Sequence, residues 1–205
     1  MSDTVVVKIG AGEKKYTLHK RLLEYHSEYF RGVRRGRFRE TEDGVIGLDD
    51  IDTDTFDIFV DWMYEKKLPL EINAVALGDG QPRMELRACV LADRLLAIEF
   101  KRTLMGFIFN VLQKWNKRPS LTSVLYSFAN LPEKDPMLQL LIDAWSVNNG
   151  LGKLRDEDKV LVPQLPKDFL TDVIIKLHQL SKVPMEDQTL QYNDYIVPVE
   201  GREGR

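Results

Sequence analysis

The stretch from Tyr16 to Thr41, YTLHKRLLEYHSEYFRGVRRGRFRET, collects the residue types that most often carry chemistry. His19 and His26 precede Ser27, and five arginines follow between Arg31 and Arg39. A histidine near a serine is the raw material of nucleophilic catalysis, histidines bind metals, and clustered arginines bind phosphates or acidic proteins. The rest of the chain decides among these three kinds of chemistry.

The spacing of these residues favours structural roles over catalysis or metal binding. Two histidines make neither kind of site without a third ligand or an orienting acid at suitable spacing, and His178 is far away in the sequence. We expect His19 to open a helix and Ser27 to cap one, because no Gly-x-Ser-x-Gly elbow surrounds the serine. The GDG at residues 78–80 lacks the further glycine of a nucleotide-binding loop. We therefore expect no catalytic residue, metal, cofactor or enzymatic activity.

Composition limits the classes of protein to which the chain can belong. Its 205 residues are 43% hydrophobic and 30% charged, which is ordinary for a globular protein with a real core. The formal net charge of −3 argues against nucleic acid as the main partner of the whole surface. Cys89 is the only cysteine, so we expect it to be a small buried hydrophobe without a disulfide. With no signal peptide and no apolar run of roughly 18 residues, we expect the protein in the nucleus or the cytoplasm.

The first part of the chain mixes strands with helices. Residues 4–18 read as a β-hairpin, and residues 45–48 as a short strand. Two short helices are expected at 20–26 and 28–35. The clearest helix follows Asp52, its N-cap, and ends before Pro69, with an inner face of apolar side chains at helical spacing. That face comprises Phe56, Phe59, Val60, Met63 and Tyr64. Residues 71–83 read as a loop.

From Met84 onward the pattern is helical. Leu86, Val90, Leu91, Leu95 and Ile98 form one apolar stripe. Ser120 and Asp135 are candidate N-caps of later helices, the second with Pro136 at the first helical position. We therefore predict an α+β domain at residues 1–112, a helical C-terminal subdomain at 113–181 and a partly disordered tail at 182–205.

Several short motifs follow one another over about residues 4–112: YTLHKRLLEYHSEYF, FRET, IGLDDIDTDTFDIFVDWMYEKKLP and LADRLLAIEF. In their order and spacing, these motifs resemble the BTB/POZ domain family. The resemblance implies a short mixed sheet flanked by a helical cluster. The helices that follow, with VLYSFANLPEKDPMLQLLIDAW and LPKDFLTDVI, are similar to the extension found in small fungal BTB proteins. Matching residues are Leu18, His19, Leu22, Leu23, Ser27, Tyr29, Phe30, Phe38, Glu40, Leu48, Phe56, Trp62, Tyr64, Leu91, Ala92, Asp93 and Leu95.

The resemblance implies a non-enzymatic protein-interaction module, and its sharper form is an adaptor for a cullin-3 ubiquitin ligase. Phe38 and Glu40 match a hydrophobic-x-Glu element that contributes to cullin binding in such adaptors, although Phe38 could equally cover a helix end. Tyr64 lies at the end of the helix that would face the same partner. The sequence names no substrate-reading domain, so a substrate would have to bind the helical half or the tail.

Two alternatives stay open at this stage. The arginines Arg34, Arg35 and Arg37 could bind acidic proteins or nucleic acid in a transcription- or chromatin-linked scaffold, or they could be a solvated helix end. Only MSD precedes the first strand, so we do not expect the dimer that many BTB domains make by exchanging an N-terminal strand. Self-association by another route, including the helical half, remains possible.

Overall fold

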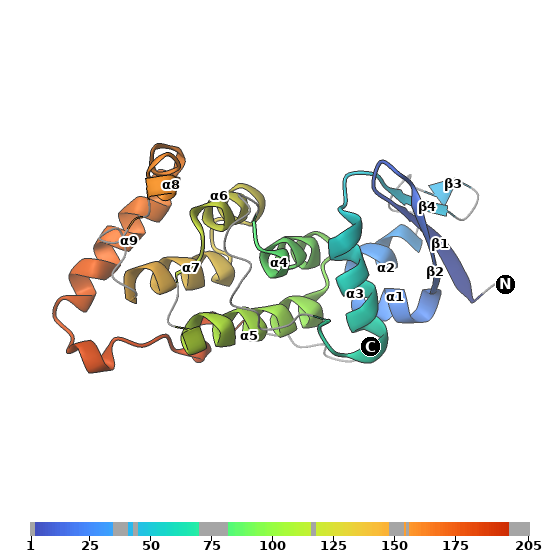
Figure 1. The fold of residues 1–205 in the computed structure, drawn as a ribbon. Helices are drawn as coiled ribbons and strands as arrows, with labels where there is room; N and C mark the ends of the chain where they lie inside the picture. The colour runs from blue at the N-terminus through green and yellow to red at the C-terminus, as the bar shows by residue number, and fades with distance from the viewer. Residues whose placement is uncertain are drawn as a thin grey trace. The chain divides into compact units, whose positions relative to one another are not determined.

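The computed structural model describes residues 3–34, 41–42, 45–69, 82–115, 118–147, 154 and 156–196. It divides into two compact units. The first unit comprises Met1–Glu71 with Met84–Leu104, and the second comprises Ile72–Arg83 with Met105–Arg205. All strands of the described residues belong to the first unit (Figure 1). The predicted α+β fold class with a helical C-terminal region is confirmed.

A four-stranded mixed sheet is the framework of the first unit. Its strands are β1 (Thr4–Ile9), β2 (Lys14–His19), β3 (Thr41–Glu42) and β4 (Val45–Leu48), in the order β2-β1-β4-β3. β1 pairs antiparallel with β2 and parallel with β4, and β3 pairs antiparallel with β4. Val7 and Ile9 are fully buried, as the two-residue period of a strand requires of one face. Gly10 opens the hairpin turn with a φ of 72°, a conformation that glycine adopts without steric cost.

Helices make up the rest of the described first unit, with α1 against β2 and α3 against α1 and α4 (Figure 1). They are α1 (Lys20–His26), α2 (Glu28–Arg34), α3 (Thr53–Glu65), α4 (Met84–Arg94) and the first part of α5 (Ile98–Trp115). Asp52 caps α3 as predicted, because its carboxylate accepts the Thr55 backbone N–H at 3.1 Å. The core below α3 is aromatic, with the Phe100 ring centre 5.4 Å from that of Phe59 and 5.0 Å from that of Trp62. Cys89 is fully buried, as predicted.

Two side chains that the sequence placed in apolar stripes lie at the surface instead. Tyr64 is 45% exposed, because the buried face of α3 centres on residues 55–56, 58–59 and 62–63. Ile98 is 49% exposed. The stripe prediction treated Leu95 and Ile98 as parts of one periodic pattern, but the helix is interrupted between them, and Ile98 begins α5 in a new phase.

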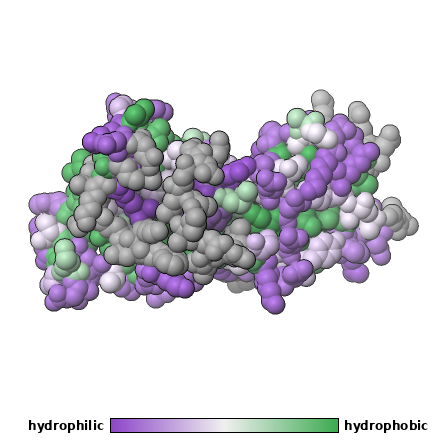
Figure 2. Space-filling view, viewed as in Figure 1, coloured by the Kyte–Doolittle hydropathy of each residue, from purple (hydrophilic) through white to green (hydrophobic). Residues whose placement is uncertain are grey.

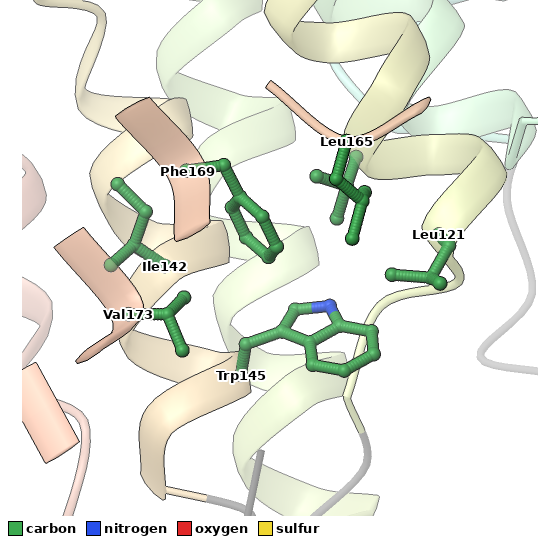
Figure 3. Packing of buried hydrophobic residues seen from close by; sticks show 7 residues of the cluster. Leu121, Ile142, Trp145, Leu165, Phe169 and Val173 are labelled. Atoms are coloured by element: carbon green, nitrogen blue, oxygen red, sulfur yellow. The ribbon is translucent and has the colours of Figure 1, made fainter. Parts of the chain in front are cut away.

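The second unit contains α6 (Leu121–Asn130), α7 (Pro136–Val147), α8 (Asp156–Lys159) and α9 (Lys167–Leu180), with short 3-10 helices η2 (Val162–Gln164), η3 (Met185–Asp187) and η4 (Tyr192–Tyr195). Ser120 caps α6 through the Ser123 N–H, and Asp135 accepts the Met137 N–H at the start of α7. Both caps were predicted. The core lies between α6, α7 and α9, where the Phe169 and Trp145 rings meet edge to face at 6.0 Å (Figure 3).

The last described residues return to this unit. Leu190 and Tyr195 are buried, at 6% and 1% exposed. The Tyr195 hydroxyl donates to Asp143 Oδ2 at 2.8 Å, while Lys176 Nζ of α9 lies 2.9 Å from Asp143 Oδ1. Asp143 is itself 3% exposed, so its charge must be met by these partners. One buried carboxylate therefore joins α7, α9 and η4.

Replacing Tyr195 with phenylalanine tests this junction. Tyr195→Phe leaves Asp143 Oδ2 buried without its hydroxyl donor, and we expect a loss of about 1–3 kcal/mol in the free energy of unfolding, measured by urea denaturation. Tyr192→Phe is the matched control, because the Tyr192 ring packs on Phe109 at 5.2 Å and the substitution keeps that contact. Equal effects of the two substitutions would contradict a specific role for the Tyr195 hydroxyl.

The buried Tyr195 hydroxyl should also make the stability of the wild-type protein depend on pH. Burial raises the pKa of Tyr195 above its ordinary value of 10.0, and the hydrogen bond to Asp143 raises it further. Above pH 10 the unfolded chain loses the phenolic proton while the folded chain keeps it, so stability falls as the pH rises from 10 toward the folded pKa. The wild-type protein should lose this contribution above pH 10 and Tyr195→Phe should not. A difference between the two that stays constant from pH 8 to 11 would contradict the assignment.

Candidate protein-interaction surface

The structure describes only part of the predicted interaction surface. Phe38, Glu40, Arg35 and Arg37 lie outside the described residues. Arg34 ends α2, and its side chain is likewise outside the description. Tyr64 is therefore the one candidate side chain whose surroundings can be stated.

Tyr64 projects from the last turn of α3 toward the junction of β2 and α1. Its hydroxyl oxygen lies 2.9 Å from His19 Nδ1 and accepts the His19 backbone N–H at 3.3 Å. His19 is the residue that precedes α1, so the prediction that it opens a helix is confirmed. Its ring is held by a residue distant in sequence. The pair is a structural contact at the surface, with the tyrosine ring half exposed.

His26 is buried beside Trp62, and the ammonium of Lys66 lies against both rings. Lys66 Nζ is 4.5 Å from the centre of the Trp62 ring and contacts the His26 imidazole. Burial lowers the pKa of Lys66, and the nearby Glu99 carboxylate works in the opposite direction. An ammonium donating to the imidazole requires His26 to be neutral. His19 and His26 thus both contact other side chains of the first unit.

A sharp corner joins α4 to α5, and it exposes two aliphatic side chains. Leu96 has a φ of 50°, and the Ala97 N–H donates to the Ala92 carbonyl at 2.8 Å. This is the helix-ending arrangement in which a left-handed residue, usually glycine, follows the last turn. Leu96 is 55% exposed and Ile98 49% exposed. Neither exposed side chain was predicted from the sequence, because leucine carries no signal for a left-handed turn.

The corner lies beside the first turn of α2. Glu28 N–H donates to the Leu96 carbonyl at 3.4 Å, and Tyr29 N–H donates to the Leu95 carbonyl at 3.3 Å. The Ser27 hydroxyl donates to the same Leu95 carbonyl at 2.6 Å and accepts from the Phe30 N–H at 3.3 Å. The predicted helix cap at Ser27 is therefore confirmed, and its hydroxyl also ties α2 to the corner.

Charged pairs border the two exposed aliphatic residues. Arg31 lies 2.5 Å from Glu28 on α2, and Arg102 lies 3.0 Å from Glu99 on α5. We call Leu96, Ile98, Glu28 and Glu99 the corner surface. Apolar side chains ringed by charge are the usual anatomy of a protein-binding site.

The described residues offer little for other chemistry. Among them, no group of three or more histidine, cysteine, aspartate or glutamate side chains could hold a metal ion. None of the described helices is long and apolar enough to cross a membrane.

Residues 2–86 match the family model of the BTB/POZ domain. Among solved structures, the BTB domain of zebrafish PATZ1 is similar to the chain, with 19% identity over 51% of this chain and 73% of that one, and a TM-score of 0.38. No curated protein matches the chain.

The chain therefore contains a BTB/POZ domain at residues 2–86, and helices follow it. The BTB/POZ domain is a protein–protein interaction module, and such domains also mediate self-association. BTB domains are generally not enzymes.

The corner surface predicts an unusual effect of a glycine substitution. A left-handed conformation costs a leucine roughly 1–2 kcal/mol that glycine does not pay. Leu96→Gly should therefore raise the free energy of unfolding by about 1 kcal/mol, because little buried area is lost at this exposed position. Leu96→Ala keeps the backbone cost and should leave stability nearly unchanged. Chemical denaturation measures both variants, and a Leu96→Gly protein less stable than Leu96→Ala would contradict the described backbone.

Proposed function

We propose that this protein is an adaptor that binds the N-terminal region of cullin-3 and so brings a partner to a ubiquitin ligase, in the nucleus or the cytoplasm. We expect the corner surface and Tyr64 to contact cullin-3, together with Phe38 and Glu40, which match the hydrophobic-x-Glu element of such adaptors. The helical unit holds the substrate or a further scaffold. The observation that supports the proposal most strongly is that Leu96 has a left-handed backbone while its side chain is half exposed.

Among the described residues, Glu13, Lys66 and Leu96 have a left-handed backbone, and Leu96 is the only aliphatic residue of the three. The side chain remains 55% exposed, so its burial does not offset the cost of the backbone conformation. Strain of this kind persists where function requires it. Binding of a partner over Leu96 and the neighbouring Ile98 would bury both side chains, at a gain of roughly 25 cal/mol per Å² of apolar area.

The flanking charges give the same face its specificity. Glu28 and Glu99 are each paired with an arginine three residues away, at partly exposed positions. Such rim pairs contribute little stability by themselves. They orient a partner and reject one whose charges do not match.

A binding experiment with full-length protein tests the adaptor proposal. Isothermal calorimetry with the N-terminal region of cullin-3 should give a dissociation constant on the order of micromolar or tighter. Phe38→Asp and Ile98→Asp should each weaken binding by at least tenfold, because each places a charge in the apolar centre of the contact. Ile175→Asp, at an isoleucine of α9 with almost the same exposure, is the control and should leave binding unchanged. No binding at tens of micromolar would refute the proposal.

The alternative of a chromatin-linked scaffold rests on the arginine run. Arg31 is engaged within the first unit: it pairs with Glu28, and its guanidinium donates to the Glu24 carbonyl at 3.0 Å. It is therefore a weaker candidate for an acidic partner than Arg34 or Arg35. Salt-dependent binding of duplex DNA that is lost on Arg34→Glu and Arg35→Glu would favour the scaffold. A flat binding curve would remove it.

A further inference from the structure

The outer face of α9 carries two exposed isoleucines, which is unusual for a helix face in contact with water. The helix buries Phe169 and Val173 in the core of the second unit. On its other side, Ile174 and Ile175 remain 59% and 50% exposed. In Figure 2, hydrophobic residues appear among hydrophilic ones in the part of the surface where Figure 1 places α9.

Exposed residues follow this face at alternating spacings of three and four. They are Asp168, Thr171, Ile175, His178 and Lys182. Because seven residues make about two helical turns, positions at this spacing form one stripe along the helix. The helical turn continues to Lys182, since the Ser181 N–H donates to the Leu177 carbonyl at 3.0 Å and the Lys182 N–H to the Gln179 carbonyl at 3.2 Å.

The charges on this stripe are arranged symmetrically about Ile175. Asp168 precedes it by seven residues and Lys182 follows it by seven, so each charge lies about 10 Å along the helix from Ile175. Within the described part of the chain, neither forms an ion pair. An antiparallel copy of the helix crossing at Ile175 places each Asp168 opposite the Lys182 of the other copy. A parallel copy would instead place like charges together.

We propose that α9 forms a two-fold symmetric interface with a second copy of this chain, in which Ile175 packs on Ile175 and two equivalent Asp168–Lys182 pairs flank it. A two-fold axis requires a self-complementary patch, and this stripe is complementary to itself only in the antiparallel orientation. The neighbouring Ile174 widens the apolar centre. This route to self-association uses residues of the helical unit, and none of the corner surface residues takes part in the proposed pairs.

Sedimentation of the full-length protein tests the interface. Between 1 and 200 µM, the average mass should rise with concentration from 23.7 kDa toward twice that value. Ile175→Asp should remain monomeric over the whole range, while Ile98→Asp, at an equally exposed isoleucine, should dimerise like the wild type. A wild-type protein that stays monomeric, or a dimer that survives Ile175→Asp, would overturn the proposal.

Charge reversal tests the antiparallel register separately from the fold. Asp168→Lys alone and Lys182→Asp alone should each raise the dimer dissociation constant about fivefold or more, because each destroys both symmetric pairs. The double variant restores opposite charges across the axis and should recover wild-type dimerisation. Failure of the double variant to recover it, with circular dichroism showing a folded protein, would overturn this register. Cullin binding plays no part in either readout, so the dimer and the adaptor role stand or fall independently.

Discussion

The corner at Leu95–Ala97 links α2, α4 and α5 of the first unit through its backbone hydrogen bonds. Leu96 turns the backbone into the left-handed region, so α4 can end and α5 can begin within four residues. The carbonyls exposed by this turn accept hydrogen bonds from the start of α2, and the Ser27 hydroxyl donates to one of them. The position of the first turn of α2 therefore depends on a backbone conformation that leucine adopts at a cost.

Much of this fold could be predicted from local chemistry. Asp52, Ser120 and Asp135 were identifiable as caps because a short polar side chain before an apolar period has one common use. The BTB/POZ domain itself followed from the order of several weak motifs. Phase errors arose where a helix broke without glycine or proline: the stripe containing Leu95 was carried across to Ile98, and the exposed corner was missed. Leucine seldom adopts a left-handed backbone, and no neighbouring residue indicates one here, so the conformation of Leu96 is known only from the structure.

The second unit also contains a feature that could not be predicted from the sequence. Asp143 is buried in an apolar helix and joins three elements through Lys176 and Tyr195. Its tyrosine partner is 52 residues away, in a stretch that the sequence assigned to a tail. Long-range pairing of a buried charge leaves no periodic pattern in the sequence. Of the predicted interaction residues, Tyr64 is placed at the surface, while Phe38, Glu40, Arg35 and Arg37 lie outside the described residues.

The functional account depends on one claim. Leucine at position 96, with the free-energy cost of its left-handed backbone, serves the binding of a partner and not the folding of the chain. The most direct test measures stability and cullin-3 binding on the same preparation of Leu96→Gly. The account predicts that stability is equal to or higher than that of the wild type while the affinity for the cullin-3 N-terminal region falls at least tenfold. A variant that binds as tightly as the wild type, or that loses stability and binding together, would contradict it.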